Sequence, residues 1–177
     1  MQKEYKINQV NPSKGALDFS YLLDAPAGKH GFVQAKNGHL YYEDGTRARF
    51  LGFNMATRSN AVNHELAEKL AGRFASLGVN VIRLHAADAP IGEQERSWSS
   101  CKEAPLLDYE KGTSRFFHPE GLDRFDYFVA KLKEKGIYIH IDLIVAREFL
   151  LGDELDYDTK VASCSKCYPM FNERLIE

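Results

Sequence analysis

Residues 66–85 read LAEKLAGRFASLGVNVIRLH, and this stretch decides the fold because it combines a helix, a stop signal and a strand. Leu66, Leu70 and Phe74 recur every four residues, which is the spacing of an apolar stripe along one helix face. Gly78 follows the stripe, and helices commonly end at such a glycine. The rest of the stretch is a short β-branched run, which predicts a buried strand.

The same unit occurs a second time further along the chain. Pro119 suits the first position of a helix, and Gly136 follows that helix as Gly78 follows the first. The run IYIHIDLIV at 137–145 then repeats the strand. With an earlier apolar run included, the sequence predicts an α/β fold. Its parallel strands lie near 50–55, 79–85 and 137–144, and its helices near 63–77 and 119–135.

A β-hairpin is expected ahead of these units. Residues 32–36 and 39–43 flank Asn37-Gly38, a pair that strongly favours a tight turn between antiparallel strands. Residues 1–30 are polar and rich in turn-forming residues. We therefore expect a lead-in segment at 1–30 that packs on one domain formed by residues 31–177.

The composition excludes several classes of protein. The 177 residues are 44% hydrophobic and 27% charged, which is ordinary for a globular domain. The net charge of -2 lacks the basic excess of a nucleic-acid binder. No apolar run approaches the ~20 residues that cross a bilayer, and residues 1–10 lack the apolar centre of a signal peptide. We expect no nucleic-acid partner, no membrane partner and, by default, a cytoplasmic location.

Polar side chains interrupt all three predicted strands, on one face of each. Because side chains alternate along a strand, Arg83 shares a face with His85, and His140 shares one with Asp142. Asn54 ends the first strand in a similar way. Buried parallel strands are normally apolar on both faces, and α/β folds bind ligands at the carboxyl ends of their strands. We expect these five residues to form a ligand site on the sheet face away from the helices.

Two simpler interpretations remain open. Arg83 and Asp142 can form a buried ion pair that serves packing alone, since such pairs are costly to break. Trp98 lies in the long connection 86–117, where it can stack on a sugar ring or only anchor the connection. Connections of this length are usually functional.

Three segments together resemble cellulase-like glycoside hydrolases of the family-five type. They are GHLYYEDGTRARFLGFNM (38–55), the stretch at 66–85, and GLDRFDYFVAKLKEKGIYIHIDL (121–143). The resemblance extends over residues 31–177. It implies a partial TIM (β/α)8 barrel with the first three β/α units, preceded by the hairpin and truncated before strand four.

The resemblance also implies roles for the candidate residues. Arg83 and His85 match the family motif beside the catalytic centre, where the arginine supports a nucleophilic carboxylate. Asn54 falls near the substrate floor, whereas His140 and Asp142 match more weakly. The expected substrate-binding residues are Asn54, Arg83, His85, Trp98, His140 and Asp142.

The family is implied to use a retaining mechanism with two glutamates, which follow strands four and seven. Both positions fall beyond Glu177, so we expect no catalytic residue within this chain and no activity from it alone. The implied function is hydrolysis of O-glycosyl bonds in poly- or oligosaccharides. The alternatives are a metal-dependent TIM-barrel hydrolase that uses His85, His140 and Asp142, and a non-catalytic carbohydrate-binding module.

The cysteines give only half of a metal motif. Cys164 and Cys167 form a C-x-x-C pair, to which Cys101 and His118 would have to be added to complete a zinc site. Ordinary free cysteines are the favoured interpretation, and no metal or cofactor is expected. The expected partner is a carbohydrate substrate, together with self-association through the run 137–145 as an exposed sheet edge.

Overall fold

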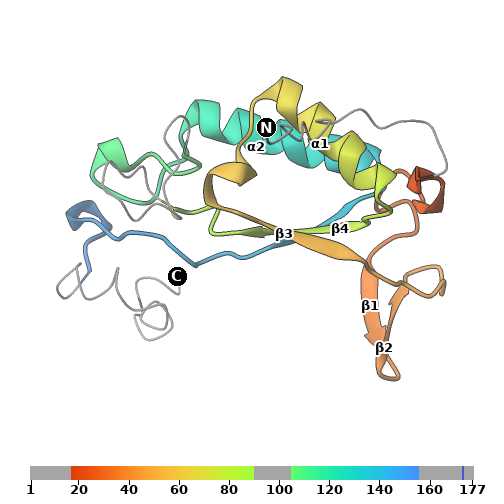
Figure 1. The fold of residues 1–177 in the computed structure, drawn as a ribbon. Helices are drawn as coiled ribbons and strands as arrows, with labels where there is room; N and C mark the ends of the chain where they lie inside the picture. The colour runs from red at the N-terminus through yellow and green to blue at the C-terminus, as the bar shows by residue number, and fades with distance from the viewer. Residues whose placement is uncertain (1–16, 90–104, 156–172, 174–177) are drawn as a thin grey trace, which may run out of the picture.

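The computed structural model describes residues 17–89, 105–155 and Glu173. Within these ranges, two helices lie on one side of a small parallel sheet, and a separate hairpin lies at one end of it (Figure 1). The single tryptophan and the three cysteines, Trp98, Cys101, Cys164 and Cys167, lie outside the described residues. Short 3-10 turns connect the elements: η1 (Ser20–Leu22), η2 (Thr57–Asn60), η3 (Tyr109–Lys111) and η4 (Leu151–Asp153).

Three parallel strands form the sheet in the order β3-β4-β5, namely β3 (Gly52–Ala56), β4 (Val81–His85) and β5 (Tyr138–Ile141). The register places Asn54 beside Arg83, and Arg83 beside His140. Paired residues on neighbouring parallel strands project from the same face, so these three side chains share one side of the sheet. The predicted α/β fold with a parallel sheet is confirmed.

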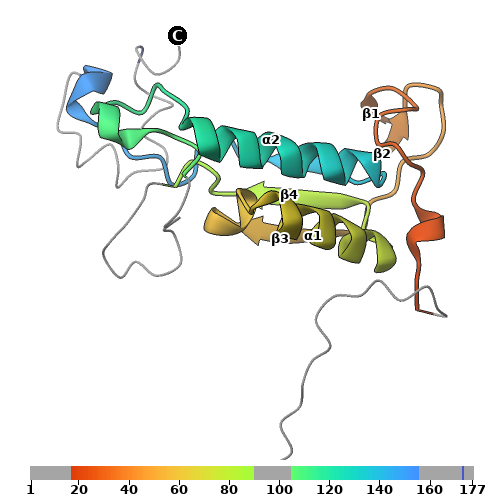
Figure 2. The same cartoon turned by 90° about the horizontal axis from the view of Figure 1, so that it is seen from above.

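Helices α1 (His64–Ser76) and α2 (Pro119–Glu134) both cover the other face of the sheet (Figure 2). Helix α1 begins as the sequence predicts, because the Asn63 side chain accepts a hydrogen bond from the Leu66 backbone N–H at 2.9 Å. Pro119 occupies the first turn of α2. Gly78 and Gly136 adopt φ angles of 73° and 82°, a left-handed backbone that lets each helix end and turn towards its strand.

The hydrophobic core lies between the helices and the sheet. Ile82 and Leu84 of β4 are fully buried in one cluster with Phe128 and Leu132 of α2. Three alanines of α1 belong to the same cluster. These strand residues have the opposite parity to Arg83, so the apolar face predicted from alternation is the face under the helices. The polar face of the sheet is left uncovered by either helix.

The hairpin packs against the amino-terminal end of this open face. Strands β1 (Val33–Lys36) and β2 (His39–Tyr42) pair in antiparallel register around Asn37-Gly38, as predicted. Tyr42 stacks on Tyr138 of β5 with ring centroids 5.6 Å apart, and Phe50 meets Tyr138 edge-on at 5.5 Å. The aromatic contact closes one end of the sheet, while the carboxyl ends of the strands point away from it (Figure 1).

The described part of the lead-in segment, residues 17–30, docks beneath the ends of both helices. The Phe19 N–H donates to the Ser76 carbonyl and the Ala27 N–H to the Lys133 carbonyl, each at 2.9 Å. A Cβ at Gly136 would come within 3.1 Å of the backbone of Ala25, so this glycine is required by the docked segment as well as by its own φ angle.

Strand β5 is shorter than the sequence suggests. The apolar run at 137–145 predicts a long strand, yet β5 ends at Ile141 and the chain bends from residue 143. The Asp88 carboxylate accepts hydrogen bonds from three successive backbone N–H groups, those of Val145, Ala146 and Arg147, at 2.8–3.1 Å. These donors are thereby turned towards the loop after β4 instead of continuing a ladder.

Candidate functional site

The five strand residues that the sequence singles out form one hydrogen-bonded cluster around Asp142. The Arg83 guanidinium contacts both carboxylate oxygens, with Nε 3.2 Å from Oδ1 and Nη2 2.5 Å from Oδ2. His85 Nδ1 lies 2.5 Å from Oδ2, and His140 Nε2 lies 3.3 Å from Oδ1. Asn54 completes the cluster, since its Oδ1 accepts from Arg83 Nη1 at 3.3 Å.

The cluster holds its carboxylate in the charged form. The hydrogen bond with His85, followed by that from Arg83, lowers the pKa of Asp142, although partial burial acts in the opposite direction. Asp142 therefore stays negatively charged at neutral pH, and it fixes the direction in which Arg83 and His85 point. Hydroxyl groups of a polar ligand would meet both donors and acceptors on this face.

Burial argues against a purely structural ion pair. The Arg83 side chain is 45% exposed, whereas that of Asp142 is 14% exposed. A pair kept for packing alone would have both members withdrawn from water, so the buried pair considered from the sequence is not what forms. The His140 side chain is 64% exposed and lies at the margin of the cluster.

The metal-dependent alternative concerns three side chains of this cluster, His85, His140 and Asp142. Across residues 17–89, 105–155 and Glu173, no group of three His, Cys, Asp or Glu side chains is arranged to hold a metal ion. His85 and His140 both contact Asp142 as ion-pair partners. His118, the described member of the suspected zinc set, instead caps α2, since its Nδ1 accepts from the Gly121 N–H at 3.3 Å.

Loops from both sides of the cluster are tied together by Asp88. Besides binding the loop after β5, this residue accepts a hydrogen bond through its backbone carbonyl from the Tyr109 hydroxyl at 2.7 Å. Tyr109 also receives the Glu148 N–H at 3.3 Å. The described parts of the loops that follow β4 and β5 are therefore connected at the carboxyl edge of the sheet.

A second carboxylate, Asp153, holds the far end of these loops and is fully buried. It accepts hydrogen bonds from the Thr113 hydroxyl at 2.6 Å, the Ser114 N–H at 2.9 Å and the Leu150 N–H at 2.7 Å. Burial pushes the pKa of Asp153 upwards, but these hydrogen bonds outweigh it and hold the pKa below the ordinary value.

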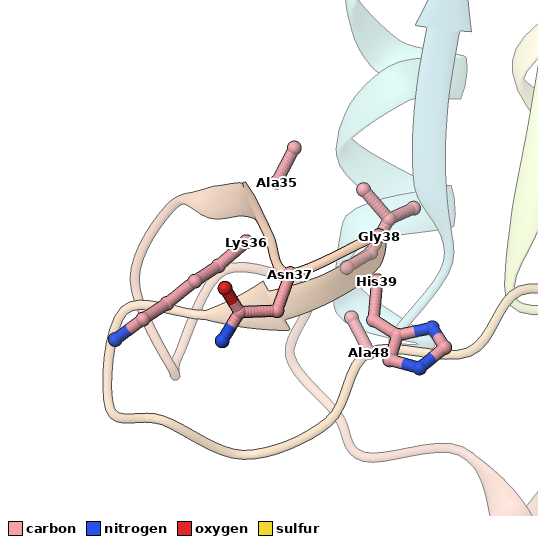
Figure 3. A pocket seen from close by; sticks show the side chains of 7 residues that line it. Ala35, Lys36, Asn37, Gly38, His39 and Ala48 are labelled. Atoms are coloured by element: carbon pink, nitrogen blue, oxygen red, sulfur yellow. The ribbon is translucent and has the colours of Figure 1, made fainter.

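Of the hollows on the described surface, two are similar in volume, and one of these borders Asp142. One of about 420 Å³ lies between the start of α2, the loop before it and the end of β5; its lining is mostly apolar and includes Leu122, Phe125, Ile141 and Asp142. The other, of about 450 Å³, lies beside the hairpin turn (Figure 3). It is lined by Lys36, Asn37 and His39 of the hairpin, which lies at the end of the sheet away from the carboxyl ends of the strands (Figure 1).

Two asparagines that the sequence analysis left without a role anchor the ends of β4. Asn80 precedes the strand, and its side chain accepts from the Leu51 N–H at 2.8 Å and donates to the Arg49 carbonyl at 2.7 Å. Asn60 donates from Nδ2 to the backbone carbonyl of His85 at 2.8 Å. The only sequence signal for Asn80 is its polarity within a β-branched run, and Asn60 gives none.

The fold and the cluster together define a mixed α/β protein with a polar site at the carboxyl edge of a parallel sheet. In comparisons with known proteins, no family model matches the chain and no curated protein matches it.

Several solved structures are similar in backbone, and two of them are glycoside hydrolases. One is a glycoside hydrolase of family 5 from Bacteroides vulgatus ATCC 8482, at 14% sequence identity and a TM-score of 0.47 over 67% of this chain. The other is called a glycoside hydrolase, at 18% identity and a TM-score of 0.47 over 67% of this chain. The alignments cover 25% and 26% of those chains, so this chain spans about a quarter of the length of each.

None of the helices within the described ranges combines the length and the apolar character needed to cross a bilayer.

Proposed function

We propose that this chain supplies part of the carbohydrate-binding site of a glycoside hydrolase, as the first three β/α units of a TIM barrel. One observation carries the proposal: polar side chains from three successive parallel strands meet on the face that the helices leave open. Asn54 lies in the middle of β3 and not at its end as expected from the sequence, and the cluster extends from there to His85 and Asp142 at the carboxyl ends of β4 and β5. Binding sites in α/β barrels lie at this edge. The sequence resemblance to family-five glycoside hydrolases supports the same assignment.

The chemistry of the cluster suits a sugar better than a simple anion or cation. Arg83 presents donors, Asn54 and Asp142 present acceptors, and His140 is exposed beside them. The hydroxyl groups of a sugar donate and accept at once, so they satisfy such a mixed set. A cluster that held only an anion would not place a charged carboxylate at its centre.

The hydrolytic step is proposed for the complete protein alone. Glycoside hydrolysis of the retaining type requires two carboxyl groups only about 5–5.5 Å apart, one as acid/base and one as nucleophile. The resemblance assigns both to positions beyond Glu177, and Asp142 is occupied by Arg83 and His85. The proposed contribution of this chain is therefore to bind and orient the substrate.

The experiment is a titration of the chain with oligosaccharides, using cello-, xylo- and manno-oligosaccharides as probes and amide NMR shifts as the readout. We expect shifts at Asn54, Arg83 and His85, and a loss of binding in Arg83→Met. Arg73→Met is the matched control, because Arg73 lies on the exposed side of α1 and the same side chain is exchanged. Shifts confined to other surfaces, or equal binding by both variants, would contradict the proposal.

A hydrolysis assay on the same material separates binding from catalysis. We expect no release of reducing sugar above background from this chain. Turnover that disappears when an acidic residue within the chain is replaced would show that the catalytic groups are present after all.

A further inference from the structure

The side chain of Asn60 is buried with one polar atom hydrogen-bonded and the other unsatisfied, which points to more than a structural role. Its side chain is 1% exposed, and its Nδ2 donates to the backbone carbonyl of His85 at 2.8 Å. Its Oδ1 is buried as well, and no hydrogen-bond partner for it lies in the described part of the chain. Leaving a buried acceptor unsatisfied is unfavourable, so such groups tend to occur where position matters more than stability.

The backbone that follows His85 is strained at the same point. Ala86 is fully buried and adopts a φ angle of 53°, in the left-handed region that residues with a Cβ rarely occupy. This conformation turns the chain directly after β4 into the loop that carries Asp88. The hydrogen bond from Asn60 to His85 is therefore made immediately before a strained turn.

We propose that Asn60 is a positioning residue that holds the end of β4 so that the His85 imidazole reaches Asp142. Asn60 donates a hydrogen bond to the backbone carbonyl of His85, and the Nδ1 atom of the same His85 lies 2.5 Å from Asp142 Oδ2. When this hydrogen bond is lost, the strained backbone at Ala86 relaxes, and the His85 imidazole moves away from the Asp142 carboxylate. The inference deepens the proposed function, since it concerns the same site.

The readout is the pKa of Asp142, measured from its side-chain carboxyl signal by ¹³C NMR without any sugar. The groups that face this carboxylate are Arg83 and His85 from β4 and His140 from β5. The hydrogen bond with His85 is the largest cause of the lowered pKa of Asp142. In Asn60→Ala we therefore expect this pKa to rise towards its ordinary value.

Asn80→Ala is the matched control, because Asn80 binds backbone groups at the opposite end of β4. It should lower the midpoint of urea unfolding but leave the pKa of Asp142 unchanged. If Asn60→Ala behaves like Asn80→Ala, Asn60 is only structural and the inference is overturned.

Asn60→Ser keeps a small donor and guards against loss of the fold in the alanine variant. We expect a pKa of Asp142 between those of the wild type and Asn60→Ala. A wild-type pKa in every folded Asn60 variant, whether or not sugars bind, would refute the positioning role without touching the proposed function. Absence of sugar binding together with the expected pKa changes would refute only the proposed function.

Discussion

Replacing Arg83 by methionine tests whether the cluster around Asp142 exists for stability or for binding. The change removes the contacts with Asp142 and the hydrogen bond to Asn54, while the methionine keeps most of the apolar length of the side chain. Asp142 keeps two partners in this variant, because His85 and His140 still contact its carboxylate.

The expected loss of stability is small. Exposed ion pairs contribute about 0–1 kcal/mol, whereas breaking a truly buried pair costs about 3–5 kcal/mol. With 45% of its side chain exposed, Arg83 belongs near the first case. We expect Arg83→Met to lower the free energy of unfolding by about 1 kcal/mol or less.

Urea unfolding, followed by circular dichroism, measures this loss, with Arg73→Met as the reference for the substitution itself. The oligosaccharide titration is run on the same variants. A loss of about 3–5 kcal/mol in Arg83→Met would show that the pair holds the fold together. The argument from exposure would then be refuted, whatever the effect on sugar binding.

Three further predictions concern regions outside the cluster. Asp153→Asn should lower the free energy of unfolding by about 2–4 kcal/mol, because one or two buried donors lose their partner at about 1–3 kcal/mol each. An unchanged midpoint of urea unfolding would contradict this. Hydrogen bonds with Asp24 and, to a smaller extent, with Asp44 raise the pKa of His30. The protonated imidazole therefore stabilises the folded chain fully below pH 6.5, its ordinary pKa, and this stabilisation is lost as the pH rises through the raised pKa. Amide exchange at Ala27, compared at each pH with His30→Gln, should show this loss, and equal exchange in both proteins at low pH would exclude it. Light scattering over a range of concentrations should show self-association that Ile141→Lys reduces, because Ile141 is exposed at the end of the edge strand β5 and Leu143 is exposed just beyond it. A monomer at every concentration would show that the edge is protected.

Local patterns were sufficient for the helices and the hairpin of this fold, for the order of its strands and for the residues of its cluster, but not for the length of β5. Helix periodicity with a glycine stop placed α1 and α2 within one or two residues, and Asn37-Gly38 placed the hairpin. Alternation along the strands then put Asn54, Arg83 and Asp142 on one side, because parity within a strand is set by the backbone alone. Their role in binding sugar stays a prediction.

Only the tertiary structure decided features that depend on contacts between distant residues. Asp88 ends β5 early by binding N–H groups more than fifty residues away, against an apolar run that by itself favours a longer strand. Asn60 reaches the carbonyl of His85, 25 residues further along the chain, from a turn that no periodicity marks. A single polar side chain carries no repeating signal, and its partner is fixed only when the core has brought the strands together, so such contacts could not be read from the sequence.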